Sequence, residues 1–249
     1  MSLLNSNISG TGEVVVFLHG FMEDASVFSG IVSSFPDKTC ISVDLFGHGE
    51  SGFDDALEPA VATMAEQVID TLTELRIDEY AVVGHSLGGY VALELLKKDI
   101  RVSQVVLLHS HPWDDSPEKK KDRDRVIEMV QTKSQVFINE AIPGLFRNPQ
   151  KNHDTVEAYK KIASLMRPSA IAWAAAAMRD RESNVNVMLE KAGQCAMIQG
   201  RHDKVVPMEK IRELSEQSGI PLVVLPDDAH MSQAEHPQMA YEALRAILG

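Results

Sequence analysis

The sequence predicts an α/β protein in which a mostly parallel sheet is flanked by helices and carries an all-helical insertion. Short continuous apolar runs alternate with stretches of helical spacing, a pattern typical of a parallel sheet covered on both faces. A glycine-flanked turn at residues 84–88 joins one apolar run directly to a helical stretch, and no strand pattern occurs between residues 112 and 181. A chain of 249 residues is long enough to bury one core of this kind.

Short apolar runs are predicted to form the strands of the sheet, over residues 13–18, 40–43, 80–83, 102–108, 196–199 and 222–225. The segments between and after them carry apolar residues at helical spacing, which predicts helices over residues 25–34, 60–75, 86–98, 208–218 and 237–248. Ligand sites in such sheets lie beyond the carboxyl ends of the strands. Polar and glycine-rich segments follow those ends here, so we expect the functional residues there.

The alternation is interrupted by residues 112–181, which divide a core made of residues 1–111 and 182–249. A helix is predicted to begin at Ser116-Pro117, followed by helices over residues 134–141, 153–166 and 169–181. The position of this insertion in the chain predicts a cap over the site. The alternative is a set of peripheral helices with no role in substrate access. The mixed charges between Asp114 and Arg125 predict a solvated helix face.

The composition is 44% hydrophobic and 24% charged, with a formal net charge of −12. An acidic chain is a poor partner for nucleic acid, because the phosphate backbone requires a basic surface. No apolar run approaches the length of a membrane span, and the amino terminus lacks the basic start and apolar core of a signal peptide. Cys40 and Cys195 stand in apolar contexts that predict buried free thiols. We therefore expect a cytoplasmic protein that acts on a small molecule.

The turn Gly84-His85-Ser86-Leu87-Gly88 carries the strongest chemical signal in the sequence. A serine between glycines at a strand-to-helix turn is a nucleophile elbow, in which the glycines leave room for a turn too tight for side chains. The turn exposes the Ser86 hydroxyl. The Leu87 amide at the start of the helix can then donate to a developing oxyanion.

A serine hydroxyl needs a base, and that base must be held by a carboxylate. The loop after the last predicted strand supplies His230, and the loop after the preceding strand supplies Asp203, which is the chain order expected for such an elbow. His236 is less suited to be the base because it stands at the start of the final helix. A carboxylate after the fourth strand, Asp114 or Asp115, is the alternative acid.

The loop after the first predicted strand is expected to supply the second oxyanion amide. Gly20 permits a sharp turn there, so Phe21 N–H is the predicted donor. The candidates for lining the substrate pocket are Met22, His109, His111, Trp113 and Met231. The spacing of the two histidines in that set fits no familiar zinc arrangement, so no metal is predicted.

Three further histidines are predicted to be structural. His19 lies beneath the oxyanion loop, His48 satisfies a turn in the glycine-rich loop after the second strand, and His85 packs away from the reacting centre. Asp44 and Ser51 are expected to hold that glycine-rich loop through local hydrogen bonds.

With these residues in place, the chain resembles the α/β-hydrolase superfamily over nearly its whole length, and most closely its small capped carboxylesterases and C–C hydrolases. The matching segments are His19-Gly20-Phe21, residues 44–49, residues 84–89, residues 200–203 and the His230 loop. The resemblance implies no cofactor and the following roles: nucleophile Ser86, acid Asp203, base His230, and oxyanion amides Phe21 and Leu87. Few residues precede the first predicted strand, so we expect the usual N-terminal hairpin to be shortened.

The expected reaction is hydrolysis of a carboxylic ester or thioester of a small to medium acyl group through an acyl-serine intermediate. Ser86 at the elbow disfavours the dehalogenase and epoxide hydrolase chemistry of relatives, which use a carboxylate nucleophile. C–C bond hydrolysis and cofactor-free perhydrolysis need the same three side chains and stay open as alternatives. A ligand-sensing member of the fold that does not turn over its ligand is the alternative from another class.

Overall fold

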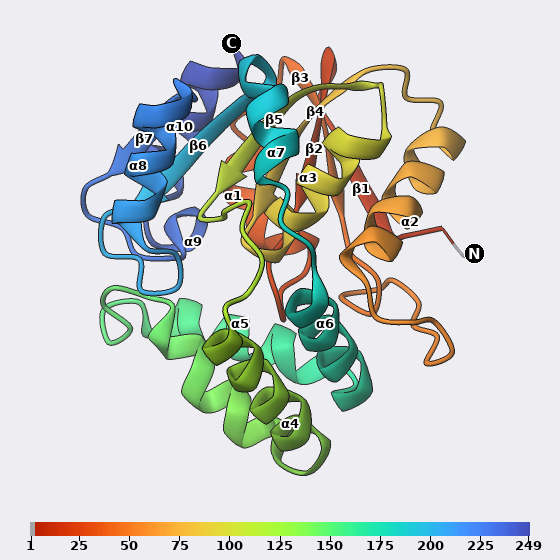
Figure 1. Ribbon diagram of the computed structural model, residues 1–249, viewed down its shortest axis with the longest axis vertical. Helices are drawn as coiled ribbons and strands as arrows, with labels where there is room; N and C mark the ends of the chain where they lie inside the picture. Colours follow the sequence, from red (N-terminus) through yellow and green to blue (C-terminus); the bar gives the residue numbers. More distant parts are fainter. Residues whose placement is uncertain (1–2) are drawn as a thin grey trace.

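The computed structural model describes residues 3–249. Met1 and Ser2, which begin the stretch searched for a signal peptide, lie outside the described residues. The centre of the molecule is a seven-stranded sheet in the order β1-β3-β2-β4-β5-β6-β7, parallel except for β1, which pairs antiparallel with β3 (Figure 1). The strands are β1 (Ser6–Ser9), β2 (Glu13–Leu18), β3 (Lys38–Val43), β4 (Tyr80–His85), β5 (Val102–Leu108), β6 (Cys195–Gly200) and β7 (Leu222–Leu225).

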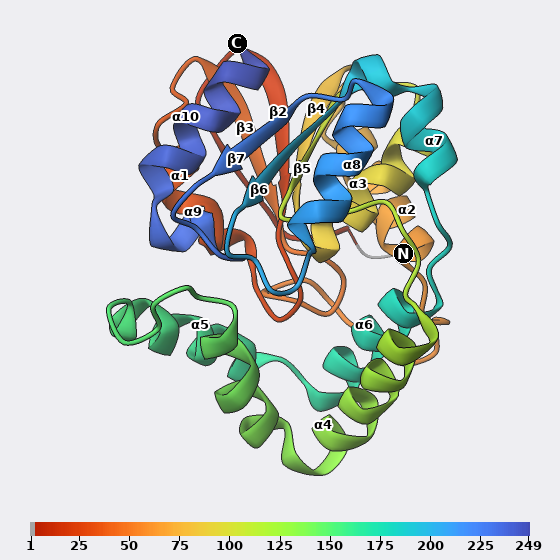
Figure 2. The same ribbon diagram turned by 60° about the vertical axis from the view of Figure 1, so that its left-hand side comes forward.

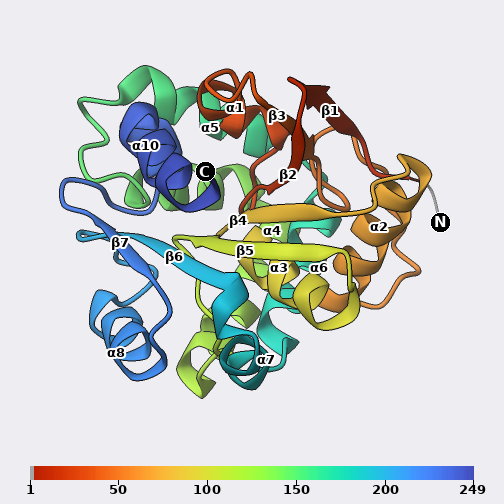
Figure 3. The ribbon, with the colours of Figure 1, turned by 90° about the horizontal axis from the view of Figure 1, so that it is seen from above.

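Helices cover both faces of the sheet. Figure 3 shows α1 (Ser29–Val32) and α10 (Pro237–Leu248) over one face, and α3 (Leu87–Lys98) and α8 (Met208–Ser218) over the other. The other short or flanking elements of this core are α2 (Val61–Glu74), α7 (Val185–Glu190), α9 (Ser232–Glu235) and the 3₁₀ turns η1 (Ala25–Phe28) and η2 (Ala192–Gln194).

Strand β2 shows why a continuous apolar run forms this sheet. Val15 and Phe17 join the apolar cluster that includes α1 and α10, whereas Val16 and Leu18 join the cluster that includes α2 and α3. All four side chains are at most 2% exposed. Successive strand side chains point to opposite faces, so a strand buried on both faces needs an apolar residue at every position.

The helical insertion forms a separate layer beyond the carboxyl ends of the parallel strands (Figure 2). It comprises α4 (Pro117–Gly144), α5 (His153–Leu165) and α6 (Pro168–Asp180), and α4 packs against both of the others. The α4 backbone kinks at Lys133, where φ is −140° and ψ is 38°. The helix predicted separately over residues 134–141 is therefore the second arm of α4. Across residues 3–249, none of the helices combines the length and apolarity that crossing a membrane requires.

Some predicted elements differ from those in the structure. Strand β1 was not predicted, because its sequence Ser-Asn-Ile-Ser has no strand-like apolar pattern and the strand is defined by backbone pairing with β3. This single strand stands where the resemblance implies a hairpin. The helix predicted over residues 25–34 is only the 3₁₀ turn η1 followed by one turn of α1. Helices α7 and α9 are too short to give a periodic signal.

Candidate active site

Ser86 stands at the turn between β4 and α3 in a backbone conformation that non-glycine residues rarely adopt, with φ of 49° and ψ of −111°. The turn is tight on both sides. A Cβ on Gly84 would lie 2.3 Å from the Gly88 carbonyl oxygen, and a Cβ on Gly88 would lie 2.1 Å from the Leu18 carbonyl oxygen. The flanking residues must therefore be glycines for the serine to reach this position.

Two hydrogen bonds hold this strained turn in place. The Ser86 N–H donates to the Leu108 carbonyl oxygen at 3.0 Å, and the Ser110 hydroxyl donates to the Ser86 carbonyl oxygen at 2.7 Å. Both partners come from β5 or the residues directly after it. Strain of this kind persists only where the surrounding structure fixes it, and it is concentrated at functional sites.

Asp203 and His230, from the loops after β6 and β7, are hydrogen-bonded at 2.8 Å between Oδ2 and Nδ1. The same carboxylate accepts the amide N–H groups of Val205 and Val206 at 2.7 and 3.0 Å and the Gln199 side-chain amide at 2.9 Å. Burial alone would raise the pKa of the Asp203 carboxyl. The His230 imidazole, through its charge when protonated and through its hydrogen bond, instead holds that pKa well below its usual range. Asp203 is thus a permanent carboxylate at neutral pH.

The Ser86 hydroxyl lines the same pocket as His230 and makes no hydrogen bond within residues 3–249. Because the carboxylate of Asp203 can only accept, the His230 proton lies on Nδ1 and leaves Nε2 as an acceptor. Hydrogen bonds between a nucleophile and its base are often long in the absence of substrate. The geometry therefore suits a serine whose proton is taken once a substrate is bound.

The two predicted oxyanion amides carry no internal hydrogen bond in the described part of the chain. Leu87 N–H is the first amide of α3, and Phe21 N–H belongs to the loop after β2. The next residue in that loop, Met22, has a positive φ of 62°, which marks a sharp reversal of the chain. The Gly20 N–H donates to the Glu23 carboxylate at 2.7 Å, which closes the loop on itself.

A buried ion pair between Glu23 and His85 lies beside the candidate nucleophile. His85 Nδ1 is 3.0 Å from Glu23 Oε2, and His85 Nε2 is 2.9 Å from the His230 carbonyl oxygen. Both of these partners are acceptors, so both ring nitrogens carry protons and the imidazole is charged. Burial alone would lower the pKa of His85, but the Glu23 carboxylate raises it above its ordinary value.

His85 was predicted only to pack away from the reacting centre, and the structure gives it a larger role. Its ring connects the oxyanion loop, through Glu23, to the loop that carries His230. Both His85 and Glu23 also line the pocket. Sequence reasoning missed Glu23 altogether. The available signal was an acidic residue three positions after Gly20, in a loop with no lysine or arginine before Lys38 to pair with it.

The pocket above Ser86 has a volume of about 220 Å³ and lies between the core and the insertion. Core residues line one side of the pocket. The other side is lined by residues of α4 and α6 and by Leu145, which directly follows α4. The lining residues are Phe21, Met22, Glu23, His85, Ser86, Tyr90, Val205 and His230 from the core, and Lys119, Arg123, Val126, Phe137, Ala141, Leu145 and Met178 from the insertion. The volume is below the usual range for ligand sites, which begins at about 300 Å³.

Four of the five predicted pocket residues lie outside this lining. His109 is fully buried behind Asp203, with Nε2 2.7 Å from the Ser232 hydroxyl, and Met231 is fully buried in the apolar core. His111 lies behind Tyr90, with its Nε2 3.1 Å from the Tyr90 hydroxyl. Trp113 lines a different hollow, against α7 and α8. The sequence located all four near the carboxyl edge of the sheet, but burial depth depends on the packing around them.

The prediction of a solvated helix face between Asp114 and Arg125 is wrong at three charged positions, of which Asp115 is buried. Lys119 and Arg123 line the pocket instead, and the side chain of Arg123 is only 14% exposed. A mixed-charge segment gives no indication of which face is covered. These two cations stand four positions apart, which was the available signal that they share one face of a helix.

The alternative acid and base are engaged elsewhere. His236 Nδ1 pairs with the Asp228 carboxylate at 2.5 Å, and its side chain is 46% exposed. Asp115 forms ion pairs with Arg123 and Arg181, and Asp114 is exposed. These residues stand apart from the contact between Asp203 and His230.

The structural predictions for the neighbouring loops agree with the structure. His19 Nδ1–H donates to the Gly20 carbonyl oxygen at 2.8 Å, and its Nε2 accepts from Leu45 N–H at 2.9 Å. Burial lowers the pKa of His48 to about 3, so this histidine is neutral. The Ser51 hydroxyl donates to the Asp44 carbonyl oxygen at 2.6 Å. The two cysteines, Cys40 and Cys195, are buried free thiols.

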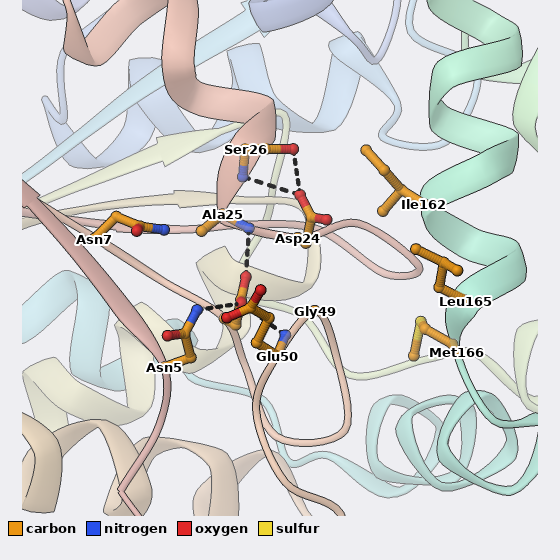
Figure 4. Close-up of a pocket in the computed structure, with 11 residues that line it drawn as sticks. Asn5, Asn7, Asp24, Ala25, Ser26, Gly49, Glu50, Ile162, Leu165 and Met166 are labelled. Carbon is orange, nitrogen blue, oxygen red and sulfur yellow. Dashed lines mark hydrogen bonds between the residues drawn. The ribbon is translucent and has the colours of Figure 1, made fainter.

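A second hollow, a groove of about 290 Å³, separates the core loops from α5. Figure 4 shows Asp24 and Ser26 on its core side, and Ile162, Leu165 and Met166 on the side of the insertion. The Asp44 carboxylate in this groove accepts two backbone amides, at 2.7 and 2.9 Å, and the Asn5 side-chain amide at 2.8 Å. Its lining residues include none of the candidate catalytic side chains. We interpret it as a gap between the core and the insertion.

Within the described residues, His109, Asp203 and His230 have ligand atoms within 4.8 Å of one another, close enough for a metal ion. Hydrogen bonds already use these atoms. The Gly200 N–H donates to His109 Nδ1 at 3.2 Å, and the Asp203 oxygens accept the bonds described above. A metal would have to displace this network. The cluster therefore fits an acid–base arrangement better than a metal centre.

The arrangement of a parallel sheet, a strained serine turn and a carboxylate–histidine pair at the carboxyl edge defines an α/β hydrolase. The model of the alpha/beta hydrolase family matches residues 15–243, and the chain belongs to this family.

Solved structures support the same architecture. A thermophilic esterase from Thermogutta terrifontis superposes with a TM-score of 0.90 at 25% identity, over 98% of this chain and 92% of that one. An enol-lactonase from Burkholderia xenovorans LB400 gives a TM-score of 0.86 at 19% identity, over 98% and 96% of the two chains. At 19% identity, the match to the enol-lactonase shows only that the two chains share a fold.

Sequence relatives match over shorter stretches. A pimeloyl-[acyl-carrier protein] methyl ester esterase from Nitrosomonas europaea is 38% identical over 114 residues, which are 45% of this chain and 43% of the relative. A 2-succinyl-6-hydroxy-2,4-cyclohexadiene-1-carboxylate synthase from Citrobacter koseri is 39% identical over 79 residues, 32% of this chain and 31% of the relative. The match thus spans less than half the length of these curated relatives.

Proposed function

We propose that the protein is a serine hydrolase that cleaves a carboxylic ester or thioester of a small to medium acyl group. The observation that carries this proposal is the 2.8 Å contact of Asp203 with His230, a residue that lines the same pocket as the strained Ser86. These three side chains supply a nucleophile, a base and a group that orients the base. No cofactor is needed for this chemistry.

In the proposed reaction, the Ser86 hydroxyl attacks the carbonyl carbon while His230 Nε2 takes its proton. The oxyanion of the tetrahedral intermediate accepts the N–H groups of Phe21 and Leu87, and His230 then gives the proton to the departing alcohol or thiol. Water attacks the acyl-serine by the same route and releases the acid. Asp203 keeps the Nδ1 proton in place and stabilises the imidazolium without itself accepting a proton.

In this proposal residues 112–181 form a cap that closes the pocket and sets the size of the acyl group. Residues of α4 and α6 line the pocket opposite Ser86. The insertion also contacts the loop of the base directly, since His230 N–H donates to the Leu145 carbonyl oxygen at 3.1 Å. The small pocket volume favours short acyl chains.

The test is hydrolysis of p-nitrophenyl esters from acetyl to dodecanoyl by the wild type and by Ser86→Ala. We expect turnover by the wild type and a loss of about 10⁴-fold or more in the variant, because triad members act as a unit. Far-ultraviolet circular dichroism checks that the variant is folded. A folded wild type that hydrolyses no ester would contradict ester hydrolysis, and C–C cleavage, perhydrolysis and ligand sensing would then be tested in turn. Equal activity of the two proteins would exclude Ser86 as the nucleophile.

A further inference from the structure

The side of the pocket formed by the insertion carries two cationic side chains, Lys119 and Arg123. They stand four residues apart on α4, so they share one face of this helix. Both line the cavity that Ser86 and His230 line from the core side. A substrate bound to Ser86 would therefore share this cavity with two positive charges.

These charges are not fully neutralised by the protein. Arg123 Nε lies 3.1 Å from one oxygen of Asp115, whose other oxygen lies 2.9 Å from Arg181 Nη1. Lys119 forms no ion pair with any residue of the described chain. One buried carboxylate thus faces three cations, and the other acidic neighbour of Lys119, Asp122, is more than half exposed and paired with Arg125. The other ionised pair in the lining, Glu23 with His85, contributes no net charge.

The neighbouring groups leave this surplus unchanged. The Arg181 guanidinium carbon lies 3.9 Å from the centre of the Tyr90 ring, a cation–π contact that holds it in place. The hydroxyl of Tyr90 is hydrogen-bonded to His111. Burial, reinforced by the charge of Arg181, lowers the pKa of His111 to about 3, so this histidine adds no charge and removes none.

The position of Lys119 is unfavourable for stability in the unliganded protein. Burial, and then the charge of Arg123, lowers the pKa of its ammonium group. It also stands in the first turn of α4, where the helix dipole disfavours a cation. The whole chain carries a formal charge of −12, so the local excess of positive charge in this pocket is opposite in sign to the charge of the protein as a whole. Local violations of this kind are expected at functional sites.

We propose that Lys119 and Arg123 bind a carboxylate of the substrate, which makes the substrate an ester or thioester that carries a free carboxylate, such as the half ester of a dicarboxylic acid. This inference rests on the proposed function. Apolar side chains, among them Val126, Phe137 and Leu145, line the same pocket and suit the methylene groups between the two ends. Lys119 and Arg123, on the side of the insertion, would select the substrate. Residues on the core side of the pocket would perform the reaction.

The test compares paired p-nitrophenyl esters of equal length, the half esters of succinate to suberate against the neutral fatty acyl esters, after subtraction of spontaneous hydrolysis. For the best chain length we expect the wild type to prefer the anionic ester by about 10- to 100-fold in kcat/KM, the range for a charge-assisted contact. Lys119→Gln and Arg123→Gln should each reduce this ratio about tenfold or more. Lys121→Gln, on the exposed side of the same helix, is the matched control and should keep it.

The two proposals fail in different ways. If the wild type hydrolyses neutral and anionic esters equally at every length, ester hydrolysis stands and the carboxylate site is refuted. If it hydrolyses none, the proposed function fails, and binding still tests the site. In that case calorimetry with folded Ser86→Ala should show that monomethyl adipate binds and that methyl hexanoate binds at least about tenfold more weakly. Equal binding of the two, or a preference unaffected by Lys119→Gln, would overturn the inference.

Discussion

The two sides of the pocket are built on different principles. On the core side, Ser86 sits on a strained turn and Asp203 accepts bonds from two backbone amides and two side chains, all in positions fixed by neighbouring strands. On the side of the insertion, Lys119 and Arg123 project from a single kinked helix and remain partly exposed. In the proposed reaction the chemistry is thus assembled on rigid elements, and the groups proposed to bind the substrate can vary without disturbing it.

The largest effect that tests this contrast is expected from Asp203→Asn. An amide in place of the carboxylate favours the wrong tautomer of His230, and kcat should fall about 10⁴-fold with the fold retained. The control is Asp114→Asn, since Asp114 is exposed in the insertion and should be neutral. Ester hydrolysis by both variants measures this. Loss of activity in the control and not in Asp203→Asn would move the acid to the insertion.

A second prediction concerns the buried pair of the core side. Glu23→Gln leaves His85 without its counter-ion, and breaking a buried pair costs about 3–5 kcal/mol in the free energy of unfolding. Asp24→Asn, one residue away and partly exposed, should cost far less. Urea unfolding of both variants measures the difference. Similar stability of both variants would show that the pair is not needed to hold the oxyanion loop.

The same pair predicts a pH dependence of stability. The lowered pKa of Glu23 stabilises the fold above its ordinary value of 4.5, and the raised pKa of His85 stabilises it below its ordinary value of 6.5. The contribution is therefore fullest between these values. It declines as pH rises through the raised pKa of His85 and as pH falls through the lowered pKa of Glu23. Urea midpoints from about pH 4 to 9 should show this decline in the wild type and not in Glu23→Gln.

A smaller difference is expected between two glycines. Gly88→Ala in the elbow places a Cβ against the Leu18 carbonyl oxygen and should destabilise the protein by about 3 kcal/mol. Gly144→Ala, in the last turn of α4, meets no atom within 4 Å and should stabilise it by about 0.5–1 kcal/mol. The midpoints of urea unfolding give both values. Equal effects at the two sites would remove the distinction between a tightly fixed core side and a tolerant insertion.

The smallest effect should come from metal removal. The ligand atoms of His109, Asp203 and His230 are occupied by hydrogen bonds, so prolonged dialysis against a chelator should leave kcat/KM unchanged. Activity that is lost on dialysis and restored by added Zn²⁺ would instead make this cluster a metal site, and the acid–base assignment would have to be withdrawn.

The sequence by itself determined the architecture of the core. Continuous apolar runs such as β5 and β7 and helices such as α8 and α10 match their predicted ranges, because burial on both faces and helical amphipathicity are local patterns. The candidate triad was also accessible, since strand ends and glycine turns fix Ser86, Asp203 and His230 to one edge of the sheet. Among the strands of residues 3–249, only β1 was missed, because it lacks an apolar pattern and forms by pairing.

The tertiary structure alone decided which side chains surround the triad. His109 and Met231 follow strand ends as Ser86 does, yet packing buries them, whereas Lys119 and Arg123 come from a segment that looks solvated in sequence. The pairing of Glu23 with His85 joins residues 62 positions apart. Such contacts form where elements far apart in the sequence pack together. The residues next to each partner in the chain do not indicate which distant residue it will contact. The hydrolase family is therefore predictable from local motifs, whereas the residues that line the pocket depend on the packing of the insertion on the core.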